Sequence, residues 1–311
     1  MGYRFGPEHP ETYVAHAYAE HLVDLGEVVM NYAVAGPENA QPLLLIPGQT
    51  ESWWGYEEAM KRLDKSFRLY AVDLRGQGRS TRTPGRYTFD NMGNDLVRFC
   101  QTVIRKPVIT CGLSSGGVLS AWLSAYAPPG VVRASFYEDP PLFGCEQRPA
   151  CGHGMHASLV SLIFGAFAKH LGNQWSVGDW AGFVNAVKKM PPVLAARPYG
   201  DEPLQTLKEY DPEWGRACVE GTISASCDHE QMLSRVKVPV LMTHHSRAPG
   251  LINGKFLGAI SDEQAARVGE LITAAGQRYD YQSHPAMGHL MHAQDPDLYA
   301  KVVTEWVATL P

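Results

Sequence analysis

The clearest structural signal in this chain is the segment Val108-Ile109-Thr110-Cys111-Gly112-Leu113-Ser114-Ser115-Gly116-Gly117. A short apolar, β-branched run leads into Gly-x-Ser-x-Gly, and the apolar residues that follow are spaced as in a helix. The pattern predicts a strand, a tight turn and a helix, with Ser114 in the turn. A Cβ at position 112 or 116 would collide with the neighbouring strand or helix, so glycine is expected at both.

In such a turn the hydroxyl of Ser114 projects from the sheet edge and can act as a nucleophile. The first N–H groups of the following helix lack partners and can stabilise an oxyanion, which makes Ser115 a candidate donor. Because Gly and Ser are common, the motif alone also fits an ordinary polar turn. Three further segments favour the catalytic interpretation.

The first of these segments is Pro42 to Thr50, an apolar strand that ends in a Pro-Gly turn. A helical stretch is expected from about Ser52 to Leu63. The turn after this strand is the usual source of a second oxyanion N–H. Gln49, directly after Gly48, is therefore the second candidate donor.

The second segment runs from Phe67 to Ser80, where a buried strand leads into Asp73-Leu74-Arg75-Gly76-Gln77-Gly78-Arg79-Ser80. Here the chain resembles the α/β-hydrolase family, whose members often carry Asp-x-Arg-Gly-x-Gly-x-Ser at this point. The resemblance implies a structural role, with Asp73 and Arg75 holding the loops beneath the site. A phosphate cradle is not expected because no Lys-Ser/Thr follows the glycines.

The third segment is Pro285 to Leu290, which contains Gly288-His289 between an expected strand (about 278–283) and an expected helix (about 296–310). The order Ser114 before His289 is the one typical of the family. A neutral imidazole near pH 7 can take the proton of Ser114 and return it to a leaving group. His292, three residues later, is expected to pack or to face solvent.

The acidic partner of His289 is less well defined by the sequence. Asp262 follows the expected strand 238–243 and precedes a helical pattern, and it is the favoured prediction. The usual short turn from strand to aspartate is replaced by a longer segment, 244–261. Ser261-Asp262-Glu263 also fits an N-terminal helix cap.

Glu138 is the alternative acid, since it ends the next strand after Ser114, expected at about 131–137. Some α/β hydrolases, including lactone-opening enzymes, resemble this arrangement. Asp139 is interpreted as a loop residue before Pro140.

Composition limits the classes of protein that this chain can belong to. With 311 residues, 45% of them apolar, it can bury a large core. A net charge of −5 without long charge runs gives no indication of nucleic-acid or membrane partners. No apolar segment is long enough to span a bilayer, and residues 1–7 lack the apolar core of a signal peptide. The expectation is a cytoplasmic protein whose partner is a small-molecule ester, and a homodimer is left open.

Six cysteines in a chain of this size do not indicate a disulfide framework. Cys145 and Cys151 are close enough in sequence to pair, but free thiols are expected. These cysteines do not form a zinc pattern with His153 and His156. No metal and no organic cofactor are expected.

The predicted architecture is a mostly parallel central sheet flanked by helices, with an inserted helical cap. Residues 1–24 form an N-terminal extension with some helical character, residues 25–139 and 236–311 form the α/β-hydrolase core, and residues 140–235 form the cap by resemblance. Helices are expected in the cap at 157–170, 177–189, 204–210 and 213–224.

Large apolar residues predict a bulky, largely apolar substrate. Trp53 and Trp54 follow the oxyanion turn, and at least one of them is expected to border the substrate. The cap supplies further apolar groups, at Leu159, Leu162, Ile163, Phe164, Phe167, Trp175, Trp180 and Phe183. Side chains that could recognise a carboxylate are Arg79, Arg82, His244, His245 and Arg247.

Residues 47–54, 112–117 and 138–143 are similar to the monoalkyl phthalate (mono-ethylhexyl phthalate) hydrolases. This resemblance implies serine-dependent hydrolysis of the remaining ester of a phthalate half-ester through an acyl-enzyme. Three alternatives keep the same catalytic groups. They are a lactone hydrolase similar to zearalenone lactonase, a carbon–carbon bond hydrolase, and a ligand receptor that retains the triad.

Overall fold

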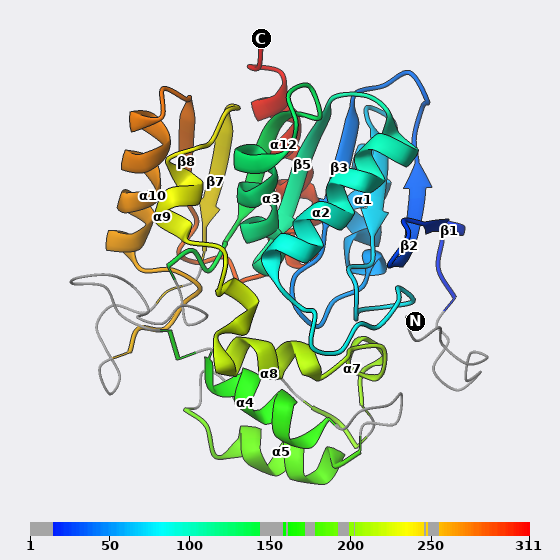
Figure 1. Cartoon of the computed structure of the whole chain (residues 1–311), viewed down its shortest axis with the longest axis vertical. Coiled ribbons are helices and arrows are strands. Elements are labelled where there is room, and N and C mark those ends of the chain that lie inside the picture. Colours follow the sequence, from blue (N-terminus) through cyan, green and yellow to red (C-terminus); the bar gives the residue numbers. More distant parts are fainter. Residues whose placement is uncertain are drawn as a thin grey trace.

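The structure is a computed structural model, and it describes residues 15–143, 158–159, 161–171, 178–191, 199–201, 203–245, 247 and 255–311. Within these residues, eight strands form one sheet in the order β1-β2-β4-β3-β5-β6-β7-β8 (Figure 1). The strands are β1 (Glu20–Asp24), β2 (Val29–Ala35), β3 (Pro42–Ile46), β4 (Arg68–Val72), β5 (Val108–Leu113), β6 (Val132–Glu138), β7 (Val240–His244) and β8 (Tyr279–Ser283). The pairs β1–β2 and β2–β4 are antiparallel, and all other pairs are parallel. The predicted mostly parallel sheet is confirmed.

The burial of each strand follows its place in the sheet. Every residue of the central strands β3 and β5 is buried, as their continuous apolar sequences require for strands covered on both faces. The edge strand β8 has no buried residue. The loops at the carboxyl ends of the central strands are therefore anchored on a fully buried part of the sheet.

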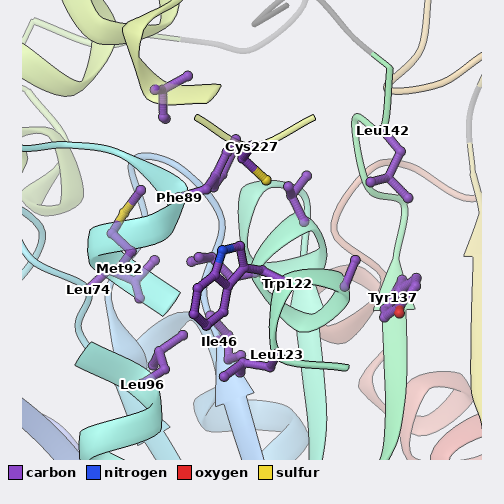
Figure 2. Packing of buried hydrophobic residues seen from close by; sticks show 14 of the residues in the cluster. Ile46, Leu74, Phe89, Met92, Leu96, Trp122, Leu123, Tyr137, Leu142 and Cys227 are labelled. Atoms are coloured by element: carbon purple, nitrogen blue, oxygen red, sulfur yellow. The ribbon is translucent and has the colours of Figure 1, made fainter. Parts of the chain in front are cut away.

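Helices cover both faces of the sheet (Figure 1). One face carries α2 (Phe89–Phe99) with the π-turn η3 (Cys100–Ile104), α3 (Ser115–Tyr126), α9 (His229–Leu233) and α10 (Asp262–Ala274). The other carries η2 (Trp53–Tyr56), α1 (Glu57–Leu63), α11 (Met291–Gln294) and α12 (Pro296–Val307). On the first face, Trp122 of α3 lies among apolar side chains of α2 and β3 (Figure 2). A Cβ on Gly93 of α2 would lie 2.3 Å from the Trp122 ring, so glycine permits this packing.

In addition to α9, the described residues between β6 and β7 form four helices and a 3₁₀ turn. They are α4 (Ser161–His170), α5 (Trp180–Lys188), α7 (Gln205–Lys208), α8 (Glu213–Glu220) and η4 (Thr222–Ser224), and their bounds follow the predicted ranges. We call α4, α5, α7 and α8 the inserted helices. They lie beyond the carboxyl ends of the parallel strands (Figure 1). The rings of Phe167 and Phe183 stack at 5.5 Å, so these two residues form part of the packing of the inserted helices.

The N-terminal part differs from the prediction of helical character. Residues 20–24 of the expected extension form β1, an edge strand of the sheet. The carboxylate of Glu20 accepts hydrogen bonds from Trp53 Nε1 (2.7 Å) and Asn31 Nδ2 (3.0 Å), and it also pairs with Arg79. These polar contacts fix a strand that has little apolar surface of its own. The division into extension, core and cap stays a prediction.

Some sequence-based predictions concern residues outside the described ranges, namely Cys145, Cys151, His153, His156 and Trp175. Among the described cysteines, Cys100, Cys111 and Cys227 are free and buried, and buried Cys218 donates to Oε1 of Gln49 (3.5 Å). No helix in the described ranges combines the length and the apolar character needed to cross a membrane.

Candidate active site

Ser114 lies in the turn between β5 and α3 with φ 54° and ψ −120°. A positive φ is unusual for a residue with a side chain, and such geometry concentrates at functional sites. The N–H of Ser114 donates to the carbonyl of Glu138 (2.9 Å), and its carbonyl accepts from the N–H of Val118 (3.1 Å). The turn therefore ties the serine to both the neighbouring strand and the following helix.

The glycines on either side of Ser114 allow this turn to form. A Cβ on Gly112 would lie 2.0 Å from the carbonyl oxygen of Gly116 in α3. A Cβ on Gly116 would lie 2.2 Å from the carbonyl oxygen of Ile46 in β3. The predicted collisions with the helix and with the neighbouring strand are confirmed.

The loop after β3 lies beside the turn that contains Ser114. The N–H of Gly48 donates to Oε2 of Glu51 (3.1 Å), and the Gln49 side chain donates to the hydroxyl of Tyr210 (2.5 Å). The main-chain N–H of Gln49 has no acceptor within the described part of the chain. Ser115 is the first residue of α3, so its N–H has no partner within the helix. Both N–H groups are available as donors.

His289 is held by Asp139, which directly follows β6. Its Nδ1 lies 2.6 Å from Oδ2 of Asp139. Oδ1 of the same carboxylate accepts the main-chain N–H of His245 (2.9 Å), and the N–H of Asp139 donates to the carbonyl of Thr243 (2.9 Å). Asp139 is buried, whereas 39% of the His289 side chain is exposed. Because Nδ1 faces the carboxylate, Nε2 is the nitrogen left for a reactant.

Charge strengthens this pair. Burial lowers the pKa of His289, but the hydrogen bond and charge of Asp139, with smaller effects of Glu51 and Glu138, raise that pKa above its usual value overall. Burial raises the pKa of Asp139, but the hydrogen bond and charge of His289 bring it below its usual value. Asp139 is therefore ionised, and its charge favours an imidazole with the proton on Nδ1.

Asp262, the favoured acid, does not contact His289. Its side chain is 75% exposed, and its Oδ1 accepts from Nε of Arg247 (2.6 Å). It opens α10, which Ser261 caps through a capping box with Gln264. The helix-cap interpretation of this segment is confirmed.

Glu138, the alternative acid, does not contact His289 through a hydrogen bond either. It is fully buried, and its two carboxylate oxygens lie 3.2 and 3.1 Å from Nδ1 of His292. Asp139 was interpreted as a loop residue, yet it is the neighbour that reaches His289. The register Leu113–Glu138 puts residue 139 beside Ser114, and this register belongs to the folded sheet and cannot be found in the local sequence.

The two tryptophans after the β3 loop have different surroundings. Trp53 is fully buried in the core, and its Nε1 donates to Glu20, so the expected role in substrate binding does not suit it. Trp54 is partly exposed and stacks on the ring of His16 with centroids 5.3 Å apart. Only Trp54 stays a candidate to border a substrate.

Asp73 supports the site from beneath, as predicted. Its carboxylate accepts hydrogen bonds from the N–H of Trp53 (2.7 Å) and of Arg79 (2.9 Å). Arg75 is bound by Asp95 through two hydrogen bonds of 2.7 and 2.8 Å. The contact of Asp73 with Trp53 connects the loop after β4 to the segment after β3, and Asp95 connects Arg75 to α2.

The five candidates for carboxylate recognition are all engaged or buried. Among the arginines, Arg79 pairs with Glu20, Arg247 binds Asp262, and Arg82 is buried. His244 contacts Tyr281 and the carbonyl of Ile260. His245 contacts Thr243 and the carbonyl of His289. Within the described ranges, no group of three or more His, Cys, Asp or Glu side chains is arranged to hold a metal ion.

Comparison with known proteins shows the family of this chain. Residues 43–302 match the model of the Alpha/beta hydrolase family. The chain belongs to this family. The 3-oxoadipate enol-lactonase 2 of Acinetobacter baylyi is 30% identical over 104 residues, which are 33% of this chain and 38% of that protein. Epoxide hydrolase 2 of Caenorhabditis elegans is 24% identical over 133 residues, 39% of this chain and 37% of that protein.

The chain thus matches well under half the length of these two curated relatives. A solved structure, the esterase RhEst1 from Rhodococcus sp. ECU1013, superposes with a TM-score of 0.66 at 19% identity. That match covers 95% of this α/β hydrolase and 100% of the esterase, and at this identity it concerns the fold alone.

Proposed function

We propose that this α/β hydrolase cleaves carboxylic esters with Ser114, His289 and Asp139 as its catalytic triad. The hydrogen bond between His289 Nδ1 and Asp139 Oδ2 (2.6 Å) carries the proposal. It leaves Nε2 as the basic nitrogen of a partly exposed imidazole. Asp139 takes the role that the sequence had suggested for Asp262.

In the proposed reaction, Nε2 of His289 takes the hydroxyl proton of Ser114 while Oγ attacks the ester carbonyl carbon. The oxyanion accepts hydrogen bonds from the N–H groups of Gln49 and Ser115, and one such donor typically contributes ~10²–10³ in rate. The imidazolium, stabilised by Asp139, gives its proton to the alcohol, which leaves. Water then attacks the acyl carbonyl and passes a proton to Nε2. The bond from the acyl carbon to Oγ breaks, Oγ takes the proton back from Nε2, and the acid is released.

The substrate that we propose is a bulky, largely apolar or aromatic ester, such as a phthalate half-ester. Support comes from the resemblance of residues 47–54, 112–117 and 138–143 to monoalkyl phthalate hydrolases, and from the partly exposed ring of Trp54 beside the β3 loop. Epoxide opening is disfavoured in spite of the epoxide hydrolase relative. That chemistry on this fold needs an acidic nucleophile, and Ser114 stands at the position.

Lactone hydrolysis is the second candidate, and the placement of Asp139 favours it. The carboxylate that holds His289 follows β6 and not β7, an arrangement in which the sequence resembles lactone-opening enzymes. The enol-lactonase relative points to the same chemistry. The steps are those of ester cleavage, except that the alcohol stays attached to the acid in one product.

Release of p-nitrophenol from a short p-nitrophenyl ester in excess tests whether the protein is an enzyme. Wild type is expected to turn over many equivalents and Ser114→Ala none, with nearly unchanged thermal unfolding. A ligand receptor would stop after about one equivalent, as expected when the acyl-enzyme persists. Such a single burst, or full activity of Ser114→Ala, would contradict the proposal. Phthalate half-esters, aryl esters and macrolactones would then be compared by product analysis.

A further inference from the structure

A second cluster of two carboxylates and an imidazole lies buried beside the proposed triad. This cluster consists of Glu138, His292 and Glu51, and the reaction described above does not use it. The ring of His292 is fully buried, and its Nδ1 lies 3.1 and 3.2 Å from the two carboxylate oxygens of Glu138. The main-chain N–H of His292 also donates to Oε1 of Glu138 (3.1 Å). Glu138 is thus committed to His292.

The opposite edge of the His292 ring faces Glu51. Nε2 lies 3.9 Å from Oε1 of Glu51, within the range of an ion pair, and no hydrogen-bond acceptor lies within its reach in the described ranges. The ring of Tyr56 stacks on the imidazole with centroids 4.0 Å apart and an interplanar angle of 25°. Stacking fixes the plane of the ring, so the imidazole is held between two carboxylates.

Electrostatics favour a charged imidazole at this position. Two carboxylates in a buried site are costly unless a cation compensates them. Burial lowers the pKa of His292, but the charges of Glu138 and Glu51 and the hydrogen bond to Glu138 raise that pKa above its usual value overall. The neighbouring groups Tyr56, Tyr299 and Cys111 all have raised pKa values because they are buried, so they stay neutral.

Glu51 connects this cluster to the loop that contains Gln49, the proposed oxyanion donor. Oε2 of Glu51 accepts the N–H of Gly48 (3.1 Å). A Cβ on Gly48 would lie 3.3 Å from Cβ of Ser114 and 3.4 Å from Oε2 of Glu51, so the carboxylate and the nucleophile flank the same glycine. Gln77 holds the main-chain N–H of Glu51 from the other side (3.2 Å).

We propose that His292 and Glu51 are positioning residues of the hydrolysis. The imidazolium of His292, anchored on Glu138, holds the Glu51 carboxylate against the Gly48 N–H and thereby keeps the next N–H, that of Gln49, directed at the oxyanion. None of these side chains needs to touch the substrate. The inference rests on the proposed function, because it assigns a task within that reaction.

The kinetic test uses Glu51→Ala, Glu51→Gln and His292→Gln with a p-nitrophenyl ester. Glu51→Ala and His292→Gln are expected to lower kcat roughly 10- to 100-fold, less than the loss of a whole oxyanion donor, with KM within about twofold. Glu51→Gln keeps an oxygen for the Gly48 N–H and is expected to lose less. Exposed Glu270 on α10 is the matched control, and Glu270→Gln is expected to behave as wild type.

Inhibition by phenylboronic acid provides a second measurement, one that does not depend on the stability of the fold. The adduct of this inhibitor with Ser114 mimics the tetrahedral oxyanion, so its Ki reports on the oxyanion donors. Its Ki is expected to rise in Glu51→Ala and His292→Gln by about the factor by which kcat falls. Folded variants with wild-type kcat and Ki would overturn the inference. The proposed function would survive that result, provided that Ser114→Ala is inactive. An active Ser114→Ala would overturn both.

The charge of His292 can be tested without turnover. In the ¹⁵N-histidine NMR spectrum of wild type, the ring signals that disappear in His292→Gln are expected to be those of an imidazolium at pH 7. In Glu138→Gln they are expected to shift toward the neutral form. A neutral His292 ring in wild type at pH 7 would overturn the inference, even if His292→Gln did not fold well.

Discussion

Ser114 and Asp139 occupy equivalent positions on neighbouring strands. Each is the first residue beyond its strand, with φ values of 54° and 43°, and the register pairs the preceding residues, Leu113 and Glu138. The backbone therefore leaves the sheet after β5 and after β6 at the same edge and with the same change of direction. The proposed nucleophile and the carboxylate that contacts His289 are placed by one parallel strand pair.

Replacing the carboxylate of Asp139 is expected to remove most of the activity. Asp139→Asn should lower kcat by ~10³–10⁴, because the amide no longer stabilises the imidazolium or the required tautomer. Asp262→Asn, which removes a charge from the exposed start of α10, should leave kcat within about twofold. Steady-state kinetics on one ester measures both. A large loss in Asp262→Asn alone would return the acid role to Asp262.

The pH profile should report the Asp139–His289 pair. The proposed mechanism needs a neutral His289, and the hydrogen bond and charge of Asp139 raise the pKa of this imidazole above its usual 6.5 in spite of burial. The rate kcat/KM should therefore fall as the pH drops through a midpoint above 6.5. In Asp139→Asn the midpoint should move to lower pH, together with a lower plateau. An identical midpoint in both proteins would show that Asp139 does not act on the imidazole.

The sequence was sufficient for most of the fold because its signals are local. Apolar β-branched runs and glycine turns gave the central strands, and helical periodicity gave the inserted helices. The strand β1 was missed because Glu20–Asp24 is mostly polar, and its pairing depends on contacts with Trp53 and Asn31 that are distant in sequence. Periodicity carries no information on such contacts.

The sequence favoured Asp262 as the acid and offered Glu138 as the alternative, whereas the carboxylate that contacts His289 is that of Asp139, one residue beyond Glu138. The reason for the one-residue difference from Glu138 is non-local. Whether residue 138 or 139 reaches the edge depends on where β6 ends, and the pairing with β5 sets this. A shift of one residue exchanges the two faces of a strand. Glu138 consequently turns toward α11, and Asp139 turns toward His289. In the same way, the sequence could not tell which of Trp53 and Trp54 enters the core.

Adding a methyl group in the turn around Ser114 is expected to destabilise the fold strongly. Gly116→Ala would bring Cβ to 2.2 Å from the carbonyl oxygen of Ile46, so strand β3 would have to move. We expect a loss of more than about 3 kcal/mol in the free energy of unfolding, or no folded protein. Gly165→Ala in α4, where nothing lies within 4 Å, should instead stabilise by about 0.5–1 kcal/mol. Urea denaturation measures both, and equal effects would contradict the clash.

Tyr210→Phe should weaken catalysis although Tyr210 is far from Ser114 in sequence. Its hydroxyl accepts the Gln49 side-chain N–H (2.5 Å) and helps to hold the loop that offers the Gln49 main-chain N–H. Losing this bond is expected to lower kcat/KM roughly 3- to 10-fold, the equivalent of about 1 kcal/mol. Tyr126→Phe, where the ring packs on Trp122, is the control and should have no effect. Equal kcat/KM in Tyr210→Phe and wild type would exclude the link.

Acid should destabilise the fold through His229. Its buried ring accepts the N–H of Phe143 (3.0 Å), and burial lowers its pKa to about 4. The unfolded chain binds the proton near pH 6.5 and the folded chain only near 4, so stability is lost as pH falls between these values. The difference in unfolding free energy between wild type and His229→Gln should shrink by roughly 2–3 kcal/mol from pH 7 to 4.5. A constant difference in urea denaturation would refute this.

The position of Asp139 also bears on how this α/β hydrolase can vary in sequence. Because the proposed carboxylate comes from β6, the proposed reaction assigns no reacting atom to the described residues between β7 and α10. Among them, His245 is the residue whose main-chain N–H holds Asp139. We therefore expect changes in the length of this connection beyond His245 to alter selectivity more readily than the proposed chemistry.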